Sequence, residues 1–362
     1  MVKKWLIMIL VALFSMTGCG KKDAQNIIQD FANKVQQTKS YTLKGNMEIY
    51  GGEETYTYSI EANFLKDNYY KVKMVNQTNN HEQIILRNND AVYVITPSLN
   101  KSFKFQSDWP DNSSQGYLLK SLAKDMSEDQ ESTVEELEGN YVVKSKINYP
   151  NNQELKYQKV TFDYDGNLKK NEIYNDKDEL KMKVTFSSID YKANLKETDF
   201  KLEDYIKEEE KSEKEESNNN ACESEGDCKT KKKKCEGDSC NQTTGSIESI
   251  LYPLYIPSNT YLTSSDKVNT EVGNRVILTF SGDKNFVLVE ETASASSDFE
   301  IIPVYGDPLI VEDTIGAIGA NSLTWTKDNI SYYLAGNNLT NEELLTIGKS
   351  IGYNTKSVAK EK

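Results

Sequence analysis

Histidine is almost absent from this chain of 362 residues, in which His81 is the only one. A metal site built from several histidines is therefore excluded, and a histidine acid–base relay is disfavoured. The segment His81–Ile85 begins like the zincin motif, but an isoleucine stands where that motif needs its second histidine. The sequence also lacks a Gly-x-Ser-x-Gly nucleophile elbow and a phosphate-binding glycine loop. We therefore predict a protein that is not an enzyme and that holds no metal or cofactor of its own.

An excess of basic residues is also missing. Lysine and arginine number 43 against 56 aspartate and glutamate residues, which gives a formal net charge of −13. A nucleic-acid-binding protein needs a basic patch or stripe, so the sequence predicts no nucleic-acid partner. The many carboxylates could include a glycosidase pair, but solvated surface charge is the favoured interpretation, because the sequence does not give their separation in space. The composition favours a binding or scaffolding protein.

Only one hydrophobic run can direct the chain to a membrane. Lys3 and Lys4 precede ten apolar residues, Trp5–Phe14, and Met16-Thr17-Gly18-Cys19 follows. This is the pattern of a secretory signal, and ten residues are about half the length that spans a bilayer. The last four residues resemble the bacterial lipobox, whose cysteine accepts a diacylglyceryl group before cleavage. We predict a signal peptide at residues 1–18, a lipidated Cys19 and a position on the extracytoplasmic face of the cell membrane. The alternative is an exported protein with a free cysteine.

Large apolar side chains are missing from residues 207–245. These 39 positions hold eight basic and eleven acidic residues, so the segment cannot bury enough apolar area to offset the entropy of ordering. We predict a linker here. The spacing of its cysteines matches no zinc-ribbon or redox motif, and both a small disulfide-pinned knot and a spacer with free thiols stay open. The four cysteines are Cys222, Cys228, Cys235 and Cys240.

The region before this linker, residues 19–206, carries the signals of one α+β domain. Apolar residues at helical spacing predict one helix over 23–38 and a second over 115–126. Elsewhere the apolar period is two, which predicts a long antiparallel meander with hairpin turns such as Asp165-Gly166. We expect a strongly curved sheet, a half-barrel, wrapped over two helices.

Residues 246–362 predict a second, smaller α+β domain. Apolar and polar residues alternate on both sides of a turn, in Val276–Phe280 and in Phe286–Glu290, which predicts a hairpin. Thr340 followed by Glu343 forms a capping box, which predicts a final helix. Because a flexible linker precedes this domain, we expect the two folded parts to be independent of each other.

Two long strings in the first domain resemble a known family. Residues 76–88 (NQTNNHEQIILRN) and 92–110 (VYVITPSLNKSFKFQSDWP) are similar to the clostridial germination lipoproteins of the GerS family. The region up to residue 206 resembles the broader LolA/RseB superfamily, in which a half-barrel sheet covers two helices. Residues 246–362 resemble the DUF4367 module, on the basis of Trp325, Tyr332-Tyr333-Leu334 and the helical pattern at 339–351.

The resemblance implies a non-catalytic role in spores, as the binding partner and activator of a zinc-dependent amidase that modifies cortex peptidoglycan for germination. The zinc would belong to that partner. Tyr93, Phe103 and Trp109 are residue types that anchor protein interfaces, although each can equally fill the core of its own domain. The superfamily implies two alternatives: a LolA-like carrier that holds a lipid or a lipoprotein anchor, and an RseB-like sensor that binds a membrane regulator.

Overall fold

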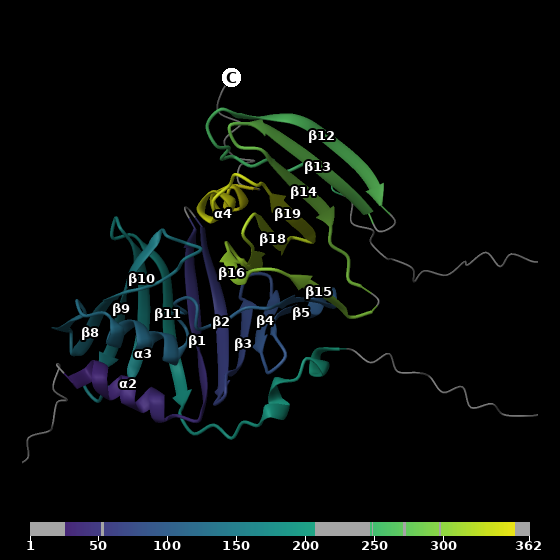
Figure 1. Cartoon of the computed structure of the whole chain (residues 1–362). Helices are drawn as coiled ribbons and strands as arrows, with labels where there is room; N and C mark the ends of the chain where they lie inside the picture. Colours follow the sequence, from purple (N-terminus) through teal and green to yellow (C-terminus); the bar gives the residue numbers. More distant parts are fainter. Residues whose placement is uncertain are drawn as a thin grey trace, which may run out of the picture.

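The computed structural model describes residues 26–51, 54–206, 247, 249–270, 273–296 and 298–351. The predicted signal peptide, Cys19 and the cysteine-containing linker lie outside these residues. Within them, no helix has the length and apolar character needed to cross a membrane. The described chain forms two sheets and three α-helices (Figure 1).

The larger sheet has twelve strands in the order β15-β6-β5-β4-β3-β2-β1-β11-β10-β9-β8-β7, and it is curved and open (Figure 1). Strands β1–β11 of this sheet pair antiparallel with one another. They are β1 (Ser40–Gly51), β2 (Glu54–Leu65), β3 (Tyr69–Asn76), β4 (Glu82–Arg87), β5 (Val92–Thr96), β6 (Lys101–Phe105), β7 (Thr133–Leu137), β8 (Asn140–Lys146), β9 (Leu155–Asp163), β10 (Leu168–Asn175) and β11 (Leu180–Asp190).

Two helices cover the β8–β11 part of this sheet (Figure 1). Helix α2 (Ile27–Gln37) buries Ile27, Phe31 and Val35, and the Phe31 ring packs edge-on against Phe162 of β9, with centroids 5.1 Å apart. Helix α3 (Leu119–Glu128) lies beside α2 and buries an apolar face of its own. The predicted α+β architecture, a curved antiparallel sheet over two helices, is confirmed.

Helix α3 begins four residues later than the apolar spacing predicts. The segment before it is held by strand β10, because Asn171 donates from its side-chain amide to the Gly116 carbonyl over 3.1 Å. A Cβ atom at Gly116 would lie 2.6 Å from Ile173, so the backbone approaches β10 more closely than a side chain allows. Tertiary contact therefore overrides the local helical pattern here.

The smaller sheet has seven antiparallel strands in the order β12-β13-β14-β19-β18-β17-β16. The predicted hairpin is confirmed as β13 and β14, but the sequence analysis missed β12, which is exposed along almost its whole length and shows no alternation. The strands are β12 (Thr260–Thr270), β13 (Gly273–Gly282), β14 (Phe286–Thr292), β16 (Asp307–Val311), β17 (Thr314–Ile318), β18 (Ser322–Lys327) and β19 (Ile330–Ala335).

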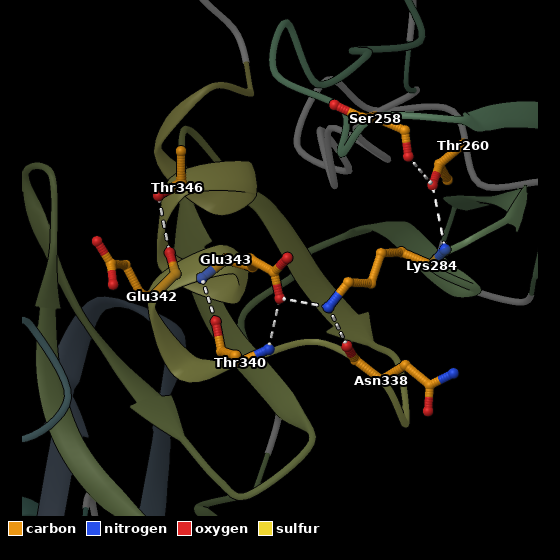
Figure 2. Close-up of polar contacts among 8 residues, drawn as sticks. All are labelled: Ser258, Thr260, Lys284, Asn338, Thr340, Glu342, Glu343 and Thr346. Carbon is orange, nitrogen blue, oxygen red and sulfur yellow. Dashed lines mark hydrogen bonds and ion pairs between the residues drawn. The ribbon is translucent and has the colours of Figure 1, made fainter.

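Helix α4 (Asn341–Lys349) closes this second part. Its predicted capping box is confirmed: Thr340 Oγ1 accepts from the Glu343 backbone N–H, and the Glu343 carboxylate accepts from the Thr340 N–H over 2.8 Å. Lys284 donates to the same carboxylate and to the Asn338 carbonyl, which ties the start of the helix to the turn after β13 (Figure 2). The cap therefore also positions the helix on its sheet.

Strand β15 (Glu300–Val304) leaves the second part and joins the first. It pairs in parallel with β6, and the Glu300 N–H donates to the Asn100 carbonyl over 2.9 Å. The expectation that the two parts are independent is therefore wrong, because they share one sheet. The domain boundaries at residues 206 and 246 stay predictions.

Candidate functional site

The second part lies against the first through a buried glutamine on β4. Gln83 is 6% exposed, and its side-chain amide pairs with the backbone of β17 as a neighbouring strand would. Its Nε2 donates to the Ile315 carbonyl over 3.2 Å, and its Oε1 accepts from the Ile315 N–H over 2.6 Å and from Thr314 Oγ1 over 3.1 Å. Ile315 and Ala317 then pack into the hydrophobic core of the first part.

A cavity of ≈ 590 Å³ opens beside this contact, between the curved sheet and the second part. Its size falls within the range that takes small ligands. One wall comes from the first part and the other from β16, β17 and the end of α4. The apolar lining consists of Ile49, Ile85, Pro150, Leu155, Met182, Pro308, Leu309, Ile310 and Ile315.

Charged side chains on the rim of the cavity form pairs. Glu154 bonds Lys181 over 2.7 Å, and Glu312 bonds Lys327 over 2.8 Å. Burial raises the pKa of Glu312 to about 6, although Lys327 acts in the opposite direction. Burial alone would also raise the pKa of Glu154, but the hydrogen bond from Lys181 leaves it below its usual value.

Asp307 is held by uncharged donors instead. Its Oδ1 accepts from Ser107 Oγ over 2.5 Å and from the Asn112 side-chain amide over 2.8 Å. Both donors belong to the first part of the chain, so this carboxylate also holds the two parts together. Its lone pairs are largely occupied before any ligand enters.

A second cavity, of ≈ 520 Å³, lies between α2, α3 and the segment at 110–114. Its lining is polar and apolar in about equal parts. One Asp125 carboxylate oxygen accepts from Ser114 Oγ over 2.9 Å, and the other is buried without a partner among the described residues. Burial raises the pKa of Asp125 to about 7.

The aromatic residues considered for a partner interface belong to the core. Trp109 is 1% exposed and Tyr93 is 3% exposed, while Phe103 is half-buried against the first core. The backbone edge of β6 is closed by β15. Because the Glu300 N–H faces β6, alternation places Pro303 on the outer side, where proline offers no N–H to a further strand. Of the two interpretations left open for Tyr93 and Trp109, burial in the protein's own core is therefore confirmed.

The exposed apolar residues gather elsewhere. Of the twelve large hydrophobic side chains that are exposed in the described residues, six lie within 252–262, which we call the apolar segment. Its backbone is fixed against the end of α4, since the Leu254 N–H donates to the Ser350 carbonyl over 3.2 Å. This segment was not predicted, although a string of tyrosine, leucine and isoleucine marks it in the sequence. The six residues are Tyr252, Leu254, Tyr255, Ile256, Tyr261 and Leu262.

His81 lies at the start of β4, close to the contact between the two parts. Burial lowers its pKa, and Asp313 acts in the opposite direction. Within the described ranges, no group of three or more histidine, cysteine or acidic side chains is arranged to hold a metal ion.

Comparison with known proteins places the chain in a family. The family described as sporulation protein YdcC-like matches residues 2–200. The chain belongs to the YdcC-like sporulation protein family. A relative, the sporulation protein YdcC of Bacillus subtilis (strain 168), is 33% identical over 343 residues, which cover 94% of each chain.

Solved structures are similar to the chain at low identity. A chain of the Pseudomonas aeruginosa MucA/MucB complex has a TM-score of 0.30 and 13% identity, and the match covers 91% of this chain and 98% of that one. A chain in the structure of the Clostridioides difficile CwlD amidase in complex with the GerS lipoprotein has a TM-score of 0.30 and 16% identity, over 48% of this chain and 98% of that one. Similarities of this size do not identify a function.

Proposed function

We propose that this YdcC-like protein is a lipid-anchored, non-catalytic lipoprotein that binds and activates a zinc-dependent cortex amidase during sporulation. The observation that carries the proposal is the apolar segment at 252–262. Exposed patches of large apolar and aromatic residues are typical of protein interaction sites. Three of its six residues are tyrosines, which anchor interfaces often.

The position of the segment agrees with a binding role. Its backbone is fixed at two points, because the Tyr255 N–H donates to Ser350 Oγ over 3.1 Å and Thr260 pairs with Gly282 at the start of β12. A surface that is already ordered loses little entropy when a partner binds. Membership of a sporulation family supplies the setting.

The test is to mix the full chain with the zinc-loaded cortex amidase of the same organism. We expect a complex in size-exclusion chromatography and a rise in lactam-forming activity that saturates at a stoichiometric ratio. The double variant Leu254→Ser/Tyr255→Ser should lose both. Tyr305→Ser is the matched control, because Tyr305 is 89% exposed but lies outside the segment. Full activity of the amidase alone, with no complex, would contradict the proposal.

Anchoring through Cys19 has its own experiment. Replacing Cys19 with serine removes the thiol that accepts the diacylglyceryl group, and we expect the protein to leave the membrane fraction. Stable anchoring needs more than one acyl chain, so no weaker contact should replace it. Cys222→Ser is the control and should stay in the membrane. Retention of the Cys19→Ser variant would show that another element anchors the chain.

A lipid or lipoprotein carrier is the second candidate, and the cavity of ≈ 590 Å³ favours it. Its apolar wall could hold an acyl chain. Organic extraction of the purified full chain, followed by mass spectrometry, tests this directly. Lipid recovered at about one molecule per chain, with no effect on the amidase, would put the carrier ahead of the activator.

A further inference from the structure

Lys349 is the charged group in the main cavity that has no bonded partner among the described residues. It is the last residue of α4, and its side chain lines the cavity from the second part. Among the described residues, its ammonium makes no hydrogen bond and no ion pair within 4.0 Å. Burial lowers the pKa of Lys349, while Glu154 and Glu312 act in the opposite direction from a distance. A cation in such a place is destabilised unless an anion reaches it.

The carboxylates around the cavity are bonded to donors other than Lys349. Glu154 is bonded to Lys181 and Glu312 to Lys327, as described above. Asp307 accepts from Ser107 and Asn112, and Glu54 accepts from the Tyr56 hydroxyl over 2.8 Å. Each acid therefore has its own donors. The ammonium is left as the one lining cation without a bonded acceptor in the described chain.

The same carboxylates limit the charge of a ligand. Four of them line the cavity, so an ion with several negative charges would be repelled. A single carboxylate can approach Lys349 and form one charge-assisted hydrogen bond. The rest of such a ligand would contact Leu155, Met182 and Ile310, which favour an apolar body.

We propose that this cavity binds an apolar monocarboxylate, with its carboxylate on the Lys349 ammonium and its apolar body between the curved sheet and β16. The site uses both parts of the chain, which explains why a cavity persists at their contact. This inference rests on the cavity of the carrier candidate and adds the group that selects its ligand, but it does not depend on the amidase or on any other protein partner. The ligand could be a free alkyl carboxylate or the carboxyl end of an apolar peptide.

The experiment uses photoreactive laurate, which carries a diazirine on its chain, with the full chain in phosphatidylcholine nanodiscs. We expect labelling of peptides that contain residues 307–315, with competition by unlabelled laurate and not by dodecanol. Lys349→Met keeps the length and apolar stem of the side chain and should lower this labelling about tenfold, the effect of one charge-assisted hydrogen bond. Lys66→Met is the control at an exposed lysine on the turn after β2, and should label as the parent does.

Each result decides the inference. Equal competition by laurate and dodecanol, or unchanged labelling of Lys349→Met, overturns the role of the carboxylate. Absence of labelling at 307–315 overturns the site. Competition by N-acetyl-Leu-Leu as well as by laurate supports the site with the carboxyl end of an apolar peptide as its source. Ile310→Trp, which fills the cavity and leaves Lys349 in place, should also abolish labelling, so the site can be tested even if Lys349→Met does not fold.

Discussion

The curved sheet is covered in two different ways along its length. Over β8–β11, helices α2 and α3 bury apolar faces that include Phe31 and Leu122, and the contact is built from side-chain packing. Over β4, the second part of the chain contributes β17, which is held by the polar Gln83 and packs only Ile315 and Ala317 into the core. The first cover belongs to the same part of the chain as the strands that it covers, whereas the second comes from residues more than two hundred positions away from β4.

The two covers therefore contribute different properties to the protein. An apolar helix face packs tightly and tolerates no space, because every lost contact destabilises the core. A contact made by the polar groups of Gln83 and Asp307 and by a few apolar residues leaves room beside it, and here that room is the cavity of ≈ 590 Å³. We therefore expect the helical cover to set the stability of the first part and the second cover to govern access to the cavity.

The largest expected effect breaks the helical cover. Phe31→Ala removes a ring that is 3% exposed and leaves a void against Phe162, so we expect a loss of about 3–5 kcal/mol in the free energy of unfolding. Chemical denaturation followed by circular dichroism measures it. Gln37→Ala, at an exposed position of the same helix, should change stability by less than about 0.5 kcal/mol. Equal effects of the two variants would show that α2 is not packed.

The next effect breaks the second cover alone. Gln83→Ala leaves the buried N–H and carbonyl of Ile315 without their partner, which costs about 1–3 kcal/mol. Hydrogen exchange should quicken in β16 and β17 and stay unchanged in α2. Gln77→Ala, an exposed glutamine before β4, is the control. Faster exchange in both covers would mean that they open as one unit.

A third experiment concerns charge in the core of the second part. Glu290 is fully buried, both its oxygens accept from the Leu251 N–H, and burial raises its pKa to about 7. The folded state thus holds a proton that the unfolded state releases from about pH 4.5, so stability falls as the pH rises from 4.5 to 7. Glu290→Gln should remove this loss. Relative to the parent, we expect its free energy of unfolding to gain on the order of 2 kcal/mol between pH 5 and pH 8. Parallel pH profiles of the two proteins would contradict it.

The smallest effect concerns the helix that carries Lys349. Thr340→Ala removes the oxygen that accepts from the Glu343 N–H, and we expect a loss of about 1 kcal/mol with earlier exchange at the start of α4 (Figure 2). Thr346→Ala is the matched control, because that hydroxyl bonds only the carbonyl of Glu342 within the helix. If both variants lose the same stability, the cap has no special role.

The sequence by itself determined the elements whose signals are local. Alternation in β1 and β2, helical spacing in α2 and the Thr340–Glu343 box each predict the structure that forms, because the apolar period and the cap act within a few residues. The signal peptide and the lipidation of Cys19, which follow from the N-terminal lysines and the apolar run, stay predictions. The missed strands β7 and β12 are exposed on both faces, so no alternation marked them.

Only the tertiary structure decided what the two parts do to each other. No local pattern shows that Pro303 closes the edge next to β6, that Gln83 replaces a strand, or that Lys349 faces a cavity walled by Met182. The sequence left Tyr93 and Trp109 as interface or core, and only the fold shows that both are buried, in two different core clusters. Such contacts join residues that are distant in sequence, and they depend on how two surfaces meet rather than on any periodicity along the chain.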